Sequence, residues 1–293
     1  MRIESRRRWQ GLLAALVVTA AFAQVPPGPP PGGPPGGPPG GPPNGPADQL
    51  PVSDEEVIRH LLPPLPATAP KPSADIRNFE GTWTHNQVTE TPILRDMYNT
   101  PLPFTPLGRK IRDRRTAGSP EGAPYANASA ECRPIGQPWA MDLFYAFQIY
   151  QTPKVVTVVF AYGHAVWNIR IGQAHRTTRA YMGDSVGHWD GDTLVVDTIN
   201  YKQGLWIDSH GTPASTDAHL VQRIRRIDHN GPMLEVVTTV DDPAMYTAKW
   251  STVRTFAWRP DRAVFSEYDC EHQAGQPDFL QRYGVVPEPK DGL

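Results

Sequence analysis

The sequence is poor in cysteine and has no long apolar run. Cys132 and Cys270 are the only cysteines in 293 residues, and no Cys-x-x-Cys pair occurs. Zinc sites built on such pairs are therefore excluded. A disulfide between Cys132 and Cys270 suits an oxidising compartment, and two buried free thiols are the alternative. No run reaches the roughly 18 apolar residues of a membrane-spanning helix.

An excess of charge of one sign is also missing. The chain has 28 Lys and Arg residues against 30 Asp and Glu, which gives a formal net charge of −2. This balance provides no electrostatic basis for binding nucleic acid or an anionic membrane. We therefore expect a small-molecule partner, no nucleic acid and no membrane span, and the oligomeric state stays open.

Familiar catalytic and cofactor motifs are absent as well. The sequence contains no His-Glu-x-x-His zinc motif, no Gly-x-Ser-x-Gly elbow, and no glycine-rich phosphate loop between a strand and a helix. We therefore predict no metal and no cofactor. Five of the nine histidines could meet only through the fold: His85, His164, His175, His188 and His219.

The N-terminus is typical of an export signal. Arg6, Arg7 and Arg8 form a basic region, residues 11–20 form a short apolar run, and Ala21-Phe22-Ala23 suits cleavage before residue 24. Residues 1–23 are therefore predicted to be a signal peptide, and the mature protein to be periplasmic or secreted. Ser5 to Trp9 also resembles a loose twin-arginine signal, so the export route stays open.

Two segments that follow cannot build a core. Residues 24–47 are almost entirely proline and glycine, a composition typical of a disordered linker. Residues 48–78 are predicted to hold a short helix and a second linker. Ser53 and Glu56 form a capping box at the start of this helix, and Pro63 ends it.

Residues 79–284 have the pattern of a β domain, followed by a C-terminal tail at 285–293. One helix is predicted from Thr105, with Pro106 in its first turn, to about Thr116. Runs rich in β-branched and aromatic residues predict the strands. They are residues 79–84, 145–150, 155–161, 165–171, 185–189, 193–199, 218–227, 233–240, 250–258 and 263–270.

The spacing of these runs sets the fold class. Asp190-Gly191 and Asn230-Gly231 are hairpin turn signals, and the short connections leave no room for crossover helices. A sheet this wide closes to remove its edges. We predict an all-β fold, an antiparallel lipocalin-like β-barrel of about ten strands with one or two short N-terminal helices.

Two features resemble known families. Gly81-x-Trp83 in the opening strand looks like the start of a lipocalin or calycin barrel. The stretch from Met182 to Thr198, MGDSVGHWDGDTLVVDT, resembles a widespread and largely uncharacterised family of exported bacterial β-rich proteins. Further matching segments are Trp206-Ile207-Asp208, residues 218–226 and the Asp241-Asp242-Pro243-x-x-Tyr246 motif.

The resemblance covers roughly residues 79–272. It implies an exported β-barrel-like domain and supplies no reaction. Family members often have His at position 184 and Glu at position 222, where this chain has Asp184 and Gln222. If the side chains at positions 184 and 222 take part in the reaction, the activity of this chain differs from that of its relatives.

Candidate site residues gather between positions 201 and 226. Trp206 and Asp208 lie in a long loop, and His219 opens a strand with Arg223 on the same face. The opposite face, which carries Leu220, Gln222 and Ile224, is the one expected to meet the packed layer. A polar barrel interior would instead bring His219 and Arg223 inside.

These residues lead to two hypotheses. In the first, an exported enzyme (a lyase, isomerase or hydrolase) acts on a small apolar or aromatic metabolite by general acid–base chemistry. His219 and Asp208 would be catalytic. The predicted substrate-binding residues are Trp206, Arg223, Arg254 and Tyr246. In the second, a periplasmic lipocalin-like carrier binds a small hydrophobic ligand without catalysis. A structural envelope protein is a third possibility.

Overall fold

The computed structural model describes residues 64–85, 92–143, 145–229, 231–262 and 284–289, which all belong to the unit Ser53–Leu293. Several predicted features lie outside the described residues. They are the signal peptide at 1–23, the linker at 24–47, the helix opened by Ser53, the strand at 263–270 and Cys270. The disulfide between Cys132 and Cys270 therefore stays a prediction.

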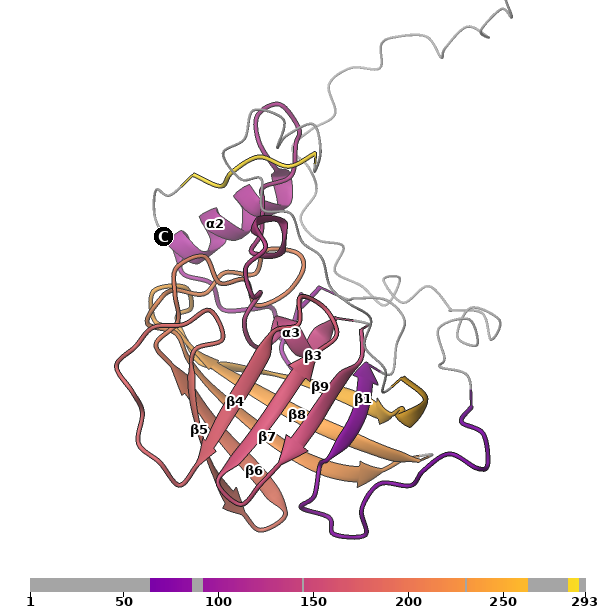
Figure 1. The fold of residues 1–293 in the computed structure, drawn as a ribbon. Helices are drawn as coiled ribbons and strands as arrows, with labels where there is room; N and C mark the ends of the chain where they lie inside the picture. Colours follow the sequence, from indigo (N-terminus) through magenta and orange to yellow (C-terminus); the bar gives the residue numbers. More distant parts are fainter. Residues whose placement is uncertain (1–63, 86–91, 144, 230, 263–283, 290–293) are drawn as a thin grey trace, which may run out of the picture. The chain divides into compact units, whose positions relative to one another are not determined.

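Nine strands form one closed barrel in sequence order (Figure 1). They are β1 (Gly81–His85), β2 (Phe147–Gln151), β3 (Val155–Phe160), β4 (Val166–Ile171), β5 (Asp184–Asp190), β6 (Thr193–Ile199), β7 (His219–Asp228), β8 (Pro232–Asp241) and β9 (Trp250–Trp258). Each lies within two residues of a predicted strand at both ends. In the turn between β5 and β6, Gly191 adopts a φ of +60°, as the Asp-Gly signal predicted.

The barrel is mixed, which corrects the prediction of an antiparallel barrel. Strands β4 and β5 pair in parallel, with Ile169 opposite Ser185, whereas every other neighbouring pair is antiparallel. A closed ring with an odd number of strands must contain at least one parallel pair, because strand direction cannot alternate around it. Residues 172–183 are long enough for the crossover. This crossover segment contains no helix, so a search for helices could not reveal it.

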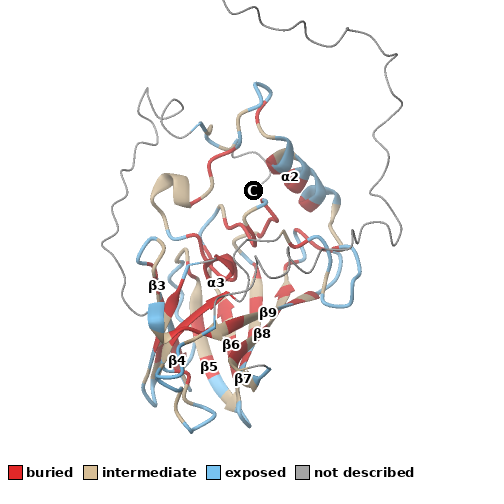
Figure 2. Ribbon diagram, turned by 90° about the vertical axis from the view of Figure 1, so that its right-hand side faces the viewer, coloured by how far each residue is buried: buried red, intermediate tan, exposed pale blue. Residues whose placement is uncertain are grey.

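Apolar side chains fill the interior of the barrel. The period-two pattern points Leu194 and Val196 of β6 inward beside Leu220 and Ile224 of β7. Aromatic rings occupy much of the remaining space. Phe147 lies 5.2 Å from Phe256 between ring centroids and 5.8 Å from Phe160. Figure 2 shows buried residues along these strands and also in the segments above them.

One end of the barrel is closed by residues that precede β1. Phe79 packs against Trp189 with ring centroids 5.4 Å apart, and Trp258 Nε1 donates to Pro70 O at 2.7 Å. A side chain at Gly81 would place its Cβ 2.2 Å from the Trp258 ring, and the φ of Gly81 is +125°. Glycine in the Gly81-x-Trp83 motif is thus required by both space and backbone conformation.

The opposite end, which we call the barrel mouth, is covered by a cap (Figure 1). The cap consists of helices α2 (Pro106–Ala117) and α3 (Trp139–Asp142) with residues 92–105, 118–138, 200–217, 242–249 and 284–289. As predicted, Thr105 is the N-cap of α2, where its side chain accepts from Gly108 N. Figure 2 shows that α2 is buried on one side only.

Two further observations complete the fold. Val286 pairs with Tyr125, and Glu288 Oε1 accepts from Arg115 Nε at 2.8 Å, so residues 284–289 pack against the rest of the cap. Among the helices that the structure describes, none combines the length and the apolar character needed to cross a membrane.

Candidate active site at the barrel mouth

A buried ion pair joins the cap to the barrel at its mouth. Asp142, the last residue of α3, accepts from Arg254 Nε through both carboxylate oxygens, at 2.8 and 3.0 Å. Arg254 lies on β9 in the inward-facing register, between Thr252 and Phe256. His85 Nε2, at the end of β1, lies 3.7 Å from Asp142 Oδ1. We call Asp142, Arg254 and His85 the mouth cluster.

Burial controls the chemistry of the mouth cluster. The side chains of Asp142 and His85 are only 10% and 4% exposed. Desolvation raises the pKa of Asp142 and outweighs the opposing effect of Arg254, while the negative charge of Asp208 adds to the rise. Asp142 therefore holds a proton more readily than an exposed aspartate, as a general acid requires.

Aromatic rings surround the mouth cluster. His85 meets Phe256 edge-on with ring centroids 5.7 Å apart. Trp139, three residues before Asp142, stacks on Trp206 with an interplanar angle of 18° and a centroid distance of 6.0 Å. Two hollows are lined by neighbouring residues. One of about 290 Å³ is lined by Ala140 and Leu143, and one of about 430 Å³ by Trp206 and Tyr181.

Asp208 lies close to this site, where its carboxylate holds parts of the cap together. Its two carboxylate oxygens accept from Ile93 N, His210 N, Thr212 N and Thr212 Oγ1, at distances of 2.7 to 3.0 Å. These bonds fix the loop that carries Trp206. With the residue 1% exposed, all its bonds are made inside the cap. Asp208 therefore influences the mouth cluster through its charge.

Tyr246 holds another part of the cap. Its hydroxyl donates to Pro213 O at 2.7 Å, and its ring packs against Trp250 and Phe104 with centroids 5.3 and 5.2 Å away. Burial raises the pKa of Tyr246 well above its ordinary value, so this hydroxyl stays protonated. The structure thus places four predicted site residues in or near the covered mouth: Trp206, Asp208, Tyr246 and Arg254.

His219 and Arg223 lie elsewhere, on the outer face of β7. Their side chains are 38% and 47% exposed, whereas Leu220 and Ile224 point inward. Arg223 pairs with Asp190 Oδ2 at 2.8 Å. The predicted partnership between His219 and Asp208 is not formed, since His219 Nε2 lies 2.8 Å from Asp197 Oδ2. The alternative of a polar barrel interior that holds His219 and Arg223 is therefore wrong, and these two residues do not share a site with Trp206 and Asp208.

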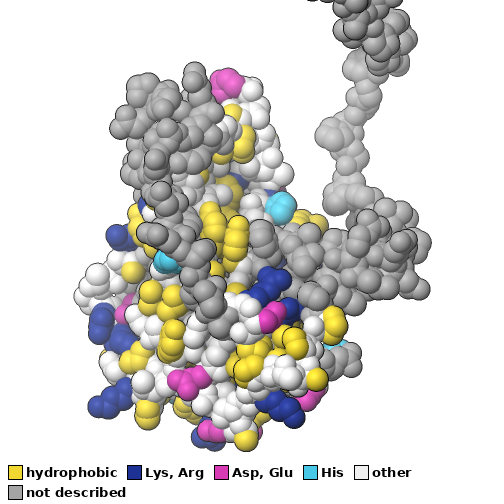
Figure 3. All heavy atoms as spheres, turned by 45° about the vertical axis from the view of Figure 1, so that its right-hand side comes forward, with side chains coloured by type: hydrophobic (Ala, Val, Ile, Leu, Met, Phe, Trp, Pro, Cys, Tyr) yellow, Lys and Arg dark blue, Asp and Glu magenta, His cyan; other side chains and the backbone are white. Residues whose placement is uncertain are grey.

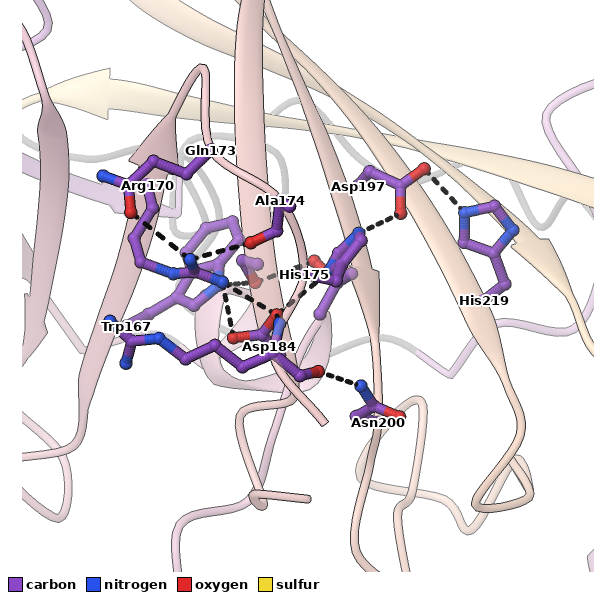
Figure 4. A network of polar contacts seen from close by, with 12 residues as sticks. Trp167, Arg170, Gln173, Ala174, His175, Asp184, Asp197, Asn200 and His219 are labelled. Carbon is purple, nitrogen blue, oxygen red and sulfur yellow. Dashed lines mark hydrogen bonds and ion pairs between the residues drawn. The ribbon is translucent and has the colours of Figure 1, made fainter. Parts of the chain in front are cut away.

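The contact of His219 with Asp197 belongs to a longer network on the outer face of the barrel (Figure 4). His175, on the crossover segment, lies between two carboxylates. Its Nε2 is 3.0 Å from Asp197 Oδ1, and its Nδ1 is 2.9 Å from Asp184 Oδ2. Arg170 Nη2 donates to both oxygens of Asp184, at 2.8 and 2.9 Å. We call these five residues the outer network.

Hydrogen bonds set the acidity of Asp184 in this network. Burial alone would raise its pKa, but the bonds from Arg176 N and His175 and the charge and bonds of Arg170 together lower it. Asp184 is therefore a stable carboxylate that fastens the crossover segment to β5. Among the described residues, no group of three or more His, Cys, Asp and Glu side chains could hold a metal ion.

Sequence reasoning missed Asp142 entirely. Asp142 ends a four-residue helix, and its partner Arg254 is 112 positions away. No local pattern signals such a pair. His85 and His175 were named only as histidines that the fold could bring together, whereas His219 was also a predicted catalytic residue. The structure joins His175 and His219 through Asp197.

In comparisons with known proteins, no protein-family model matches the chain and no curated protein matches it.

Proposed function

We propose that this protein is an exported enzyme that acts on a small apolar or aromatic metabolite by general acid–base chemistry at the mouth cluster. The observation that carries the proposal is the Asp142 carboxyl, which is buried beside His85 with a raised pKa although it pairs with Arg254. Clusters of this kind are typical of active sites. A lyase, an isomerase or a hydrolase would each use such a group.

The three residues suggest distinct roles. Asp142 would donate a proton to the substrate, or accept one, and His85 would exchange protons with it as the second titratable group. Arg254 orients Asp142 through Nε, and its positive charge would stabilise a developing oxyanion. The rings of Phe256, Trp139 and Trp206 supply the apolar surroundings that favour an aromatic substrate.

Hydrogen exchange at carbon tests this proposal without knowledge of the final product. The protein is incubated in D2O with a panel of small aromatic and alicyclic ketones and esters, and deuterium uptake is followed by mass spectrometry. We expect the wild-type protein to speed exchange at carbon next to the carbonyl of at least one compound, and Asp142→Asn to abolish this. Exchange should also fall as the pH rises through the raised pKa of Asp142, if its acid form is the active one.

His219→Ala is the matched comparison, because His219 is the other acid–base candidate and lies outside the mouth. It should keep the wild-type exchange rate. Loss of exchange in His219→Ala with full exchange in Asp142→Asn would overturn the assignment in favour of the outer network. Failure of the wild-type protein to exchange any compound of the panel would count against proton transfer at carbon, and therefore against a lyase or isomerase.

One observation favours the alternative of a lipocalin-like carrier. Gln222 points into the barrel and is 0% exposed, and neither its Nε2 nor its Oε1 has a hydrogen-bond partner among the described residues. Because an unpaired buried amide is costly, a bound polar group at this position would stabilise the barrel. A ligand that binds tightly without chemical change, and that loses affinity in Gln222→Leu, would support the carrier.

A further inference from the structure

A groove on the outside of the barrel is lined by more positively than negatively charged side chains, although the chain as a whole is slightly negative. It lies between β4, the start of β5 and the crossover segment, and its volume is about 490 Å³. Four cations line it (Arg170, Arg176, Arg179 and Lys202) against one carboxylate, that of Asp184. The whole chain carries a formal net charge of −2. On the face seen in Figure 3, basic and acidic side chains are scattered among apolar ones.

Two of these cations are available to a ligand. Asp184 neutralises Arg170, and Asp217 pairs with Arg179 at 2.8 Å. Among the described residues, neither Arg176 nor Lys202 has an acidic partner. The ammonium group of Lys202 instead lies 4.8 Å from the centroid of the Tyr181 ring. The groove therefore offers positive charge that no acidic partner within the described ranges cancels.

The backbone that carries these cations is held in place. Arg176 N donates to Asp184 Oδ2 at 2.8 Å, and Asn200 Nδ2 donates to Arg176 O at 2.6 Å. Lys202 N donates to Ala180 O, and Ala180 N donates to Asn200 O, both at 3.0 Å. The outer network of Figure 4 thus fixes one wall of the groove through Asp184. A preorganised site loses less entropy when a ligand binds.

The remainder of the groove is apolar. Tyr181 lies between two cations, because the guanidinium of Arg133 is 5.2 Å from its ring centroid. Pro134, Val166 and Met182 continue this apolar lining. A volume of this size fits a small organic molecule, so the groove suits a ligand with a negatively charged end and an apolar or aromatic body.

We propose that this groove binds a small organic oxyanion, a phosphate monoester, sulfate ester or carboxylate carried on an aromatic or apolar body. Lys202 and Arg176 would bind the oxyanion, since cations and planar guanidinium forks match its geometry. Tyr181 and its apolar neighbours would contact the body. The site contains no residue of the mouth cluster, although Tyr181 and Lys202 also line the hollow beside Trp206. Its test measures ligand binding and does not require the proposed reaction.

Isothermal titration calorimetry of the full chain with phenyl phosphate, phenyl sulfate and benzoate tests this proposal. Inorganic phosphate and phenol are the control ligands, because each carries only one half of phenyl phosphate. At least one of the three aromatic anions should bind more tightly than both inorganic phosphate and phenol, and added NaCl should weaken it. The strongest of the three identifies the oxyanion. Absence of binding by all three, or binding no tighter than that of inorganic phosphate, would overturn the proposal.

Charge reversal locates the site. Lys202→Glu and Arg176→Glu change exposed side chains, and each should weaken binding about tenfold or more through lost attraction and added repulsion. The matched control is Lys71→Glu, which makes the same charge change at an exposed position beside Pro70, at the closed end of the barrel. Equal affinity in Lys202→Glu and Lys71→Glu would show that the groove is not the binding site.

Discussion

The mouth cluster and the outer network each contain an aspartate bound to an arginine through both carboxylate oxygens, yet the two carboxyls titrate in opposite directions. The pKa of Asp142 is raised and that of Asp184 is lowered. Asp142 has Arg254 and is deeply buried, so desolvation dominates. The Asp184 side chain is almost equally enclosed, 11% exposed against 10% for Asp142, but it accepts also from a backbone N–H and from His175. The number of additional donors, more than the arginine, decides which way the pKa moves.

The sharpest way to test this contrast is to remove the arginine from the buried pair. Arg254→Met should destabilise the protein by about 3 kcal/mol at neutral pH, because Asp142 is left buried without its cation. Since burial already raises the folded-state pKa of Asp142, its carboxyl is tolerated at low pH and becomes unfavourable as the pH rises through that value. Urea unfolding at several pH values should therefore show a deficit that grows with pH. A deficit independent of pH would mean that packing, not charge, is lost.

The outer network should respond in the opposite sense. Asp184→Asn should destabilise by about 1–2 kcal/mol at neutral pH through weakened bonds to Arg170, His175 and Arg176 N. Because the folded-state pKa of Asp184 is lowered, its stabilisation is present above the ordinary carboxyl range and is lost as the pH falls through the folded value. The difference from wild type in urea unfolding should thus shrink below about pH 4. A difference that persists in acid would contradict the role of the charge.

An exposed ion pair on the same barrel is expected to contribute least to the stability of the fold. Arg223 meets Asp190 at 2.8 Å, a distance as short as in the buried pair, but both side chains are largely in solvent. Arg223→Met should change the melting temperature by no more than about 1–2 °C. Thermal unfolding by circular dichroism measures this. A shift as large as that of Arg254→Met would break the link between burial and the strength of these pairs.

Much of the barrel could be predicted from local sequence. Alternating apolar residues such as Leu194 and Val196 mark strands, and Thr105 before Pro106 marks the start of α2. The parallel pairing of β4 with β5 could not be predicted, because the crossover segment carries no periodic pattern. The tenth predicted strand lies outside the described residues, and so does Cys270.

The candidate site was predicted less well, for a physical reason. Alternation correctly separated the face of Leu220 from that of His219, but it could not name the partner of His219. The register of β6 against β7 brings Asp197 to within 2.8 Å of His219. The carboxylate of Asp208 instead accepts hydrogen bonds inside the cap, for example from Thr212 Oγ1. Arg254 was a predicted substrate-binding residue, and its pairing with Asp142 emerged only from the fold.

The sequence by itself determined which segments become strands, where their turns lie and which side chains share a face, because these depend on residues a few positions apart. Tertiary structure alone decided that nine strands close with one parallel pair, and that Asp142 meets Arg254 and His85 under a cap. Such contacts join positions far apart in the chain. Their chemistry arises from desolvation, which only the assembled fold imposes.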